Sequence, residues 1–154
     1  MVKTILLSLL IPIFSLIGKR FSKKYELTRK FFEDFRLFTN IFEKEIDFSE
    51  KSLKEIINDF PIKNGDFYKF LTNAILNKEI VKPNYILETD FSLINNFIKE
   101  LGVSDKYTQK NIVLDFKNYL SSAYEKAKKD ETVNKNLYFK LGLLFGLFIF
   151  ILLF

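Results

Sequence analysis

The side chains of this 154-residue chain that could do chemistry are its carboxylates, because the sequence contains no cysteine and no histidine. This excludes disulfides, Cys–His nucleophiles and thiolate or imidazole zinc ligands. Neighbouring carboxylates can still act as a general acid and base, and three such pairs are candidates here: Glu33 with Asp34, Glu43 with Glu45, and Glu88 with Asp90. All three pairs fall among charged positions with no nucleophile or metal partner, so we interpret them as solvent-facing helix residues.

Binding of nucleotides or nucleic acids is also unsupported. The sequence has no glycine-rich GxxxxGK[ST] loop to hold phosphates. The net charge of +5 is typical of nucleic-acid binding at first sight, but residues 31–120 carry 12 Lys and Arg against 15 Asp and Glu. We therefore predict a protein that is not an enzyme and has no cofactor, no metal site and no nucleic-acid partner.

The positive charge lies next to two uncharged ends. Residues 19–30 carry six basic side chains and one acidic one, and their first four basic residues are Lys19, Arg20, Lys23 and Lys24. Residues 4–18 and 141–154 carry no charge. Extended to about eighteen residues, each end would reach roughly 27 Å, close to the roughly 30 Å of a bilayer core. We predict an N-terminal transmembrane segment at 1–18 and a C-terminal one at 137–154.

Each end has an alternative interpretation. Residues 4–18 could be a cleaved signal peptide, but they lack a small-residue cleavage pair and the basic cluster that follows is typical of a retained anchor. Residues 141–154 could be a buried core helix, but they have no polar face.

The flanking charges predict the orientation. Lys and Arg next to membrane segments stay on the cytoplasmic side, so residues 19–136 should form a cytoplasmic domain. The basic clusters either only set this topology, which is the simpler interpretation, or also bind anionic lipid head groups. Membrane lipid is thus a predicted partner.

Two glycines in the C-terminal segment are spaced for close helix packing. Gly142 and Gly146 form a small-xxx-small pattern, which lets another helix approach the backbone in lipid. The partner would be the N-terminal segment or a second copy of the chain, giving a homo-oligomer.

The apolar spacing of residues 19–136 is helical throughout, so we predict an all-α helical bundle of about five to six helices flanked by the two membrane segments. The first helix should run over 19–47, continuous with the membrane segment. An aromatic stripe on it could stack on nucleic-acid bases, but its helical spacing favours a core. The stripe consists of Phe21, Tyr25, Phe32, Phe35, Phe38 and Phe42.

Local signals divide the remainder into shorter helices. Ser52-x-x-Glu55 is a capping box that should open a short helix ended by Pro61. A helix follows over 67–75, and another from 87 should stop at Gly102. Ser104 or Asp105 should cap a last long helix that runs toward the membrane.

The segment Leu101-Gly102-Val103-Ser104-Asp105, followed by Gln109, resembles the LG-x-SD-x-x-x-Q signature of the stage III sporulation protein AB family. Residues 136–142 with Gly146 are similar to that family's closing pattern of an aromatic residue, a basic residue, Leu-Gly and an apolar tail. The sequence departs from the family at Ser52, where Pro is common, and in having no Trp around 78–90.

The resemblance implies a component of the complex between mother cell and forespore in endospore-forming bacteria. Such a protein would sit in the mother-cell membrane around the forespore, with its central domain in the cytoplasm and similar to the cytoplasmic domains of the type II secretion F platform protein. Its role would be a scaffold that contacts a cytoplasmic ATPase and other membrane subunits. Gly102, Ser104, Asp105 and Gln109 would have structural roles at a helix junction.

Two other functions fit the same features. Short apolar ends with basic flanks are also typical of small membrane-disrupting, holin-like proteins. A membrane-tethered helical adaptor unrelated to sporulation would share every structural feature.

Overall fold

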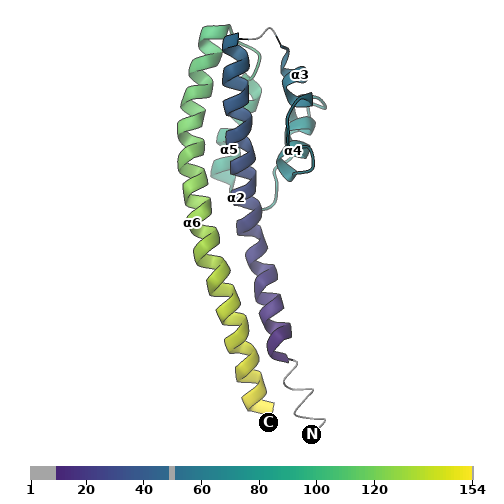
Figure 1. Cartoon of the computed structure of the whole chain (residues 1–154), viewed down its shortest axis with the longest axis vertical. Coiled ribbons are helices and arrows are strands. Elements are labelled where there is room, and N and C mark those ends of the chain that lie inside the picture. Colours follow the sequence, from purple (N-terminus) through teal and green to yellow (C-terminus); the bar gives the residue numbers. More distant parts are fainter. Residues whose placement is uncertain (1–9, 49–50, 154) are drawn as a thin grey trace. The chain divides into compact units, whose positions relative to one another are not determined.

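The computed structural model describes residues 10–48 and 51–153, and within these ranges the chain forms five α-helices and no strand (Figure 1). The all-α fold class is therefore confirmed. The helices are α2 (Leu10–Phe48), α3 (Leu53–Asn58), α4 (Asp66–Ile75), α5 (Glu88–Glu100) and α6 (Lys106–Leu153). The long first and last helices expected from the sequence are α2 and α6.

The chain divides into two compact units. Unit 1 comprises Met1–Arg29 and Lys126–Phe154, and unit 2 comprises Lys30–Glu125. The boundaries between the units fall inside α2 and α6. Residues 1–9, half of the predicted N-terminal membrane segment, lie outside the described residues, so that segment and the boundaries predicted at 18 and 136 stay predictions.

Phenylalanine rings form the core of unit 2. Phe35 of α2 is fully buried, and its ring centroid lies 4.9 Å from Phe67 of α4, 5.8 Å from Phe97 of α5 and 5.1 Å from Phe116 of α6. Aromatic rings prefer such tilted and edge-to-face contacts because of their quadrupoles. Within unit 2, α4, α5 and α6 therefore all pack on α2.

The aromatic stripe of α2 divides between core and surface. Four of its members, Phe32, Phe35, Phe38 and Phe42, are at most 4% exposed, as expected. The expectation is wrong for Phe21, which is 63% exposed. Phe21 belongs to unit 1, where no short helices are present to cover it among the described residues.

The short helices begin where the sequence signals place them. Ser52 caps α3: its hydroxyl accepts from the Glu55 amide, and the Glu55 carboxylate accepts from the Ser52 amide at 2.7 Å. The predicted capping box is thus confirmed. Helix α4 begins after Gly65 and has Asp66 in its first turn. A negatively charged side chain at this position is stabilised by the positive end of the helix dipole.

In unit 1 the two long helices run antiparallel. The ring of Phe14 lies 5.7 Å from that of Phe145, and Arg29 is bonded to Glu131 at 2.5 Å. As residue numbers rise along α2, those of the contacting residues fall along α6. The N-terminal and C-terminal apolar segments of the chain therefore meet within this unit.

Candidate functional site

The carboxylates of the first two candidate acid–base pairs, Glu33–Asp34 and Glu43–Glu45, interact with other side chains of the chain. Glu43 forms an ion pair with Lys117 of α6, and Glu45 lies 3.9 Å from Lys51. Glu33 and Asp34 also have partners within the structure.

The third pair shows the same behaviour. Glu88 pairs with Lys82 at 2.7 Å, and Asp90 accepts a hydrogen bond from the Tyr119 hydroxyl at 2.9 Å. Burial, assisted by this bond to Asp90, raises the pKa of the Tyr119 phenol. Over the described part of the chain, no three potential metal ligands come together. Two of these carboxylates, Glu43 and Asp90, therefore bind side chains of α6 and connect it to α2 and α5.

The motif residues meet at the corner between α5 and α6. Gly102 follows the end of α5 with φ +74°, a left-handed conformation that side-chain-bearing residues adopt at a cost. Its amide donates to Oε1 of Gln109 at 2.6 Å. Leu101 places its side chain in the core, 6% exposed. The residue that stops one helix is therefore held by a side chain from the next.

Of the two residues expected to cap α6, Ser104 and Asp105, the structure shows that Asp105 is the cap. Its Oδ1 accepts from the amides of Tyr107 at 3.0 Å and Thr108 at 3.1 Å, and its Oδ2 accepts from the Thr108 hydroxyl at 2.6 Å. These bonds, above all the one from the Thr108 hydroxyl, lower the pKa of the Asp105 carboxyl. The helix N-terminus is satisfied within the chain.

A recess of about 280 Å³ lies beside this corner. Its apolar lining comes from α2 and α3, and Gly102, Ser104 and Gln109 contribute to its other side. Gln109 is 4% exposed, and its Nε2 has no hydrogen-bond partner in the described structure. Burying an unpaired amide costs about 1–3 kcal/mol, so this nitrogen is a donor the fold leaves unused.

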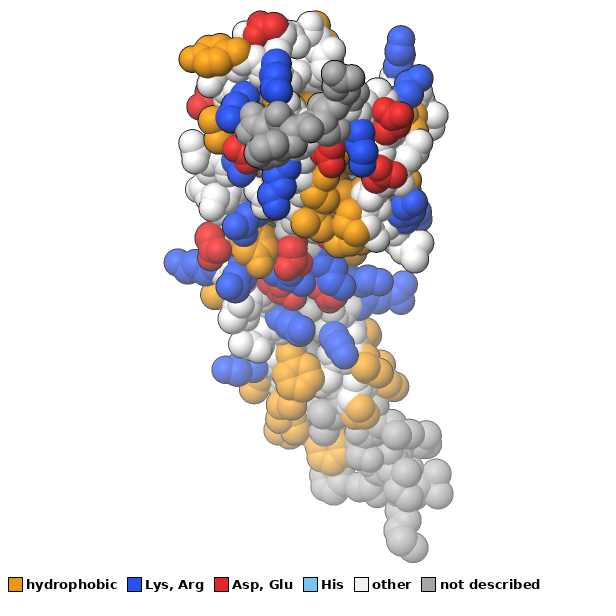
Figure 2. All heavy atoms as spheres, turned by 45° about the horizontal axis from the view of Figure 1, so that its top comes forward, with side chains coloured by type: hydrophobic (Ala, Val, Ile, Leu, Met, Phe, Trp, Pro, Cys, Tyr) orange, Lys and Arg blue, Asp and Glu red, His pale blue; other side chains and the backbone are white. Residues whose placement is uncertain are grey.

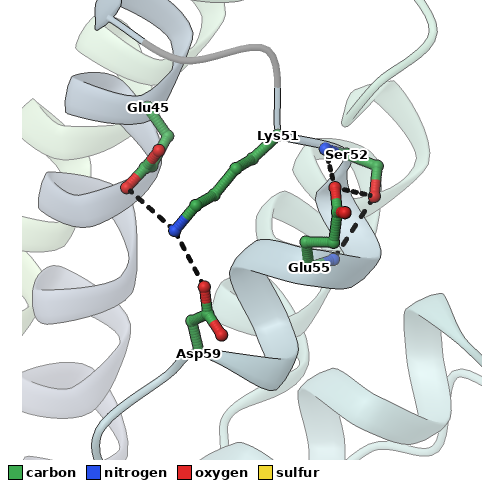
Figure 3. Close-up of polar contacts among 5 residues, drawn as sticks. All are labelled: Glu45, Lys51, Ser52, Glu55 and Asp59. Atoms are coloured by element: carbon green, nitrogen blue, oxygen red, sulfur yellow. Dashed lines mark hydrogen bonds and ion pairs between the residues drawn. The ribbon is translucent and has the colours of Figure 1, made fainter.

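A lysine connects the two helices that line the recess. Lys51 reaches Asp59 of the α3 end at 2.8 Å and Glu45 of α2 at 3.9 Å, as Figure 3 shows beside the Ser52–Glu55 capping box. The hydrogen bond and charge of Asp59 raise the pKa of Lys51, while the same contact lowers the pKa of Asp59. The sequence pattern did not reveal this bridge because residues 45 and 59 belong to different helices.

In unit 1, glycines form the crossing of α2 and α6. A Cβ on Gly142 would collide with the backbone of Phe14, and a Cβ on Gly18 would collide with the carbonyl of Tyr138. Gly142 therefore packs on the N-terminal segment, one of the two partners expected for it, and Gly146 is buried one turn further along. Gly18 was not predicted, although its place as the last residue of an uncharged stretch was a signal.

The basic flank of α2 lies next to aromatic side chains. Lys19, Arg20, Lys23 and Lys24 are all exposed. Between them and the next turn, the rings of Phe21 and Tyr25 stack on Tyr138 of α6, with centroids 6.4 Å and 6.1 Å apart. Aromatic and basic residues of this kind are typical of a membrane–water interface.

The C-terminal part of α6 is long and apolar enough to cross a membrane, and it is the helix with this property among the described residues. Of an apolar 18-residue stretch within α6, 6% is buried. A core helix would be mostly covered by other elements, so the alternative of a buried core helix at 141–154 does not fit.

These features define an all-helical protein with a membrane-capable C-terminal helix and a glycine-stopped, Asp-capped corner at the start of that helix. Residues 63–154, more than half of the chain, match the family model of stage III sporulation protein AB. The chain belongs to this family, which the corner motif and closing pattern indicated. Comparisons with curated proteins and with solved structures find no match.

Proposed function

We propose that this protein is a membrane-anchored scaffold subunit of a sporulation complex between mother cell and forespore. Membership of the stage III sporulation protein AB family supports a role in sporulation. The observation that carries the scaffold role is the continuity of α6, a single helix of 48 residues that begins at the corner motif and ends in the apolar stretch. The helix α6 thus contributes both to the phenylalanine core of unit 2 and to the membrane-capable segment.

The proposal includes a location and partners. The protein lies in the mother-cell membrane around the forespore, and residues 19–136 face the mother-cell cytoplasm because the basic flanks of both ends border this region. It contacts a cytoplasmic ATPase and other membrane subunits of the complex, and it catalyses no reaction itself. The ion-paired state of its candidate carboxylates supports a non-enzymatic role.

Deletion and complementation of the gene test this proposal. Deletion should block sporulation after engulfment and reduce heat-resistant spores by orders of magnitude. Full-length protein should restore spores, whereas a chain ending at Lys140 should not. Replacing residues 141–154 with an unrelated transmembrane helix tests whether spore formation needs only membrane anchoring or also specific helix contacts. Normal spore yield in the deletion strain would contradict the proposal.

The holin-like alternative is motivated by the exposed apolar side chains of the last helix. Expression of the protein alone in a non-sporulating host distinguishes the two functions. A scaffold subunit should leave the membrane potential intact, while a holin-like protein should collapse it. Transcript timing during starvation separates both from an adaptor that acts outside sporulation.

A further inference from the structure

Unit 1 carries positive charge that the chain does not neutralise. Nine basic side chains of this unit are exposed and form no ion pair with any described residue. They are Lys19, Arg20, Lys23, Lys24, Lys126, Lys128, Lys129, Lys135 and Lys140. In unit 2, Lys51, Lys82 and Lys117 each bind a carboxylate, and unit 2 also has exposed lysines without such a partner, which serve below as controls. These nine cations of unit 1 are therefore accessible to anions outside the chain.

Some of these cations are held at the level of the glycine crossing. Lys19 and Arg20 directly follow Gly18, which abuts Tyr138, and Lys140 lies two residues beyond Tyr138 on α6. At about 1.5 Å of helix rise per residue, all three cations lie within about one turn of the crossing. Basic residues from opposite ends of the chain thus form a ring near this crossing.

This ring coincides with the boundary between polar and apolar surface. Beyond it, α6 exposes large apolar side chains, including Leu144 at 60% and Phe148 at 59%. At the boundary itself, Phe21 remains 63% exposed although it stacks on Tyr138. In Figure 2, blue Lys and Arg side chains lie next to orange apolar ones along this part of the molecule.

We propose that a cationic ring, defined as Lys19, Arg20, Lys23, Lys24 and Lys140, binds the phosphate groups of anionic phospholipids in the membrane that α6 enters. The proposal rests on the proposed membrane anchoring and adds a lipid preference to it. The head-group region adds roughly 5–7 Å to each side of the hydrocarbon core, and the five cations spread over about two helical turns, from which long Lys and Arg side chains can extend toward this region. Lipid fits better than free phosphate because the exposed apolar side chains below the ring need acyl chains beside them.

Energy transfer to labelled lipids tests the ring in the full-length protein. Because the chain lacks cysteine, V133C provides a single labelling site, 55% exposed and near the ring. The protein is reconstituted into vesicles that contain phosphatidylglycerol or phosphatidylcholine carrying the same acceptor dye and acyl chains. We expect enrichment of phosphatidylglycerol around the protein on the order of threefold or more, lost at 1 M salt.

Two variants separate the ring from net charge. The ring variant K19Q/R20Q/K23Q/K24Q/K140Q should abolish the enrichment. The control removes five exposed lysines of unit 2, K44Q/K54Q/K63Q/K69Q/K78Q, and should retain it. If the ring variant does not fold by circular dichroism, K140Q alone and K19Q/R20Q should each reduce the enrichment in part. Equal effects of the ring and control variants would overturn the proposal.

The remaining outcomes distinguish this proposal from the proposed function. A protein that floats with phosphatidylcholine vesicles but shows no preference for phosphatidylglycerol is anchored without the ring acting, which overturns the lipid proposal alone. A protein that does not float with any vesicle overturns the membrane anchoring itself. Full competition by millimolar inorganic phosphate would show a general anion site and would likewise overturn the lipid assignment.

Discussion

Backbone conformation decides which residue can stand at the α5–α6 corner. Gly102 has φ +74°, and the nearest atom to a Cβ placed there would be Leu53 Cδ2 at 3.7 Å, an ordinary contact. Space therefore does not require glycine, but the left-handed conformation does. Lys78, after the end of α4, has φ 56° and bears the same penalty with a side chain present.

Reciprocal substitutions at these positions should change stability in opposite directions. We expect Gly102→Ala to lower the free energy of unfolding of unit 2 by about 1–2 kcal/mol and Lys78→Gly to raise it by about 1 kcal/mol. Gly102→Asn should cost less, since Asn tolerates the left-handed region. Urea denaturation followed by circular dichroism measures all three. An unchanged free energy of unfolding for Gly102→Ala would contradict the argument that the left-handed conformation requires glycine.

Acid should destabilise unit 2 through its hydrogen-bonded carboxylates. The pKa values of Asp105 and Glu55 are lowered by hydrogen bonds from Thr108 and Ser52 respectively, and that of Asp59 is lowered by Lys51. Because each folded-state pKa lies below its unfolded value, the contribution is fully present above the unfolded pKa of about 4 and is lost as the pH falls through the folded one.

We therefore expect unfolding midpoints that are nearly constant from about pH 5 to 7 and that fall below about pH 4. Asp105→Asn should make this acid dependence shallower, and Asp115→Asn, an exposed residue of α6, serves as the control. Parallel pH profiles for the wild type and Asp105→Asn would show that this cap does not titrate as argued.

At the scale of elements, close backbone contact rather than a broad apolar interface joins α2 and α6 in unit 1. Gly18 and Gly142 both lie where a Cβ would meet the opposing main chain. In lipid, helices gain little from burying apolar surface, and small residues allow the close packing that replaces it. The arrangement places Phe14 against Phe145 on the apolar side of the crossing.

Enlarging Gly142 should separate the two helices. In the double variant F14C/F145C, a short thiol cross-linker should join the two positions within one chain. We expect Gly142→Ile to slow this reaction at least severalfold in the same background, because its side chain would displace the backbone of Phe14. Leu144→Ile, at a 60% exposed position, is the matched control. Equal rates for both variants would exclude the glycine contact.

At the scale of the whole molecule, the two units differ in what stabilises them. Unit 2 has a continuous aromatic core around Phe35, while unit 1 exposes most large side chains of its α6 segment. A domain with its own core can fold alone. Exposed apolar surface on the scale of the α6 end instead marks a membrane or partner contact.

A fragment of residues 30–125 should therefore be water-soluble and unfold cooperatively, while the full-length chain should require detergent. Gel filtration, circular dichroism and urea denaturation of the fragment provide the measurement. Phe35→Ala within the fragment should cost about 3–5 kcal/mol, which tests whether the aromatic core is its source of stability. A fragment without a cooperative transition would show that unit 2 depends on the rest of the chain.

The sequence alone indicated the helices and several of their ends. The capping box at Ser52, the stop at Gly102 and the uncharged tail are local signals, because helix caps and periodicity depend on residues within a few positions of each other. The corner motif is local as well, and for that reason its residue types and spacing were sufficient to indicate the family.

Only the tertiary structure decided which residues of one predicted helix face are buried and which are exposed. Phe21 and Phe35 lie on one predicted stripe, yet one is exposed and the other is fully buried, because α4 and α5 cover only the second. Likewise, the partner of Gly142 and the bridge from Lys51 to Asp59 and Glu45 depend on segments brought together by folding. Periodicity assigns a residue to a helix face, but packing determines what that face contacts.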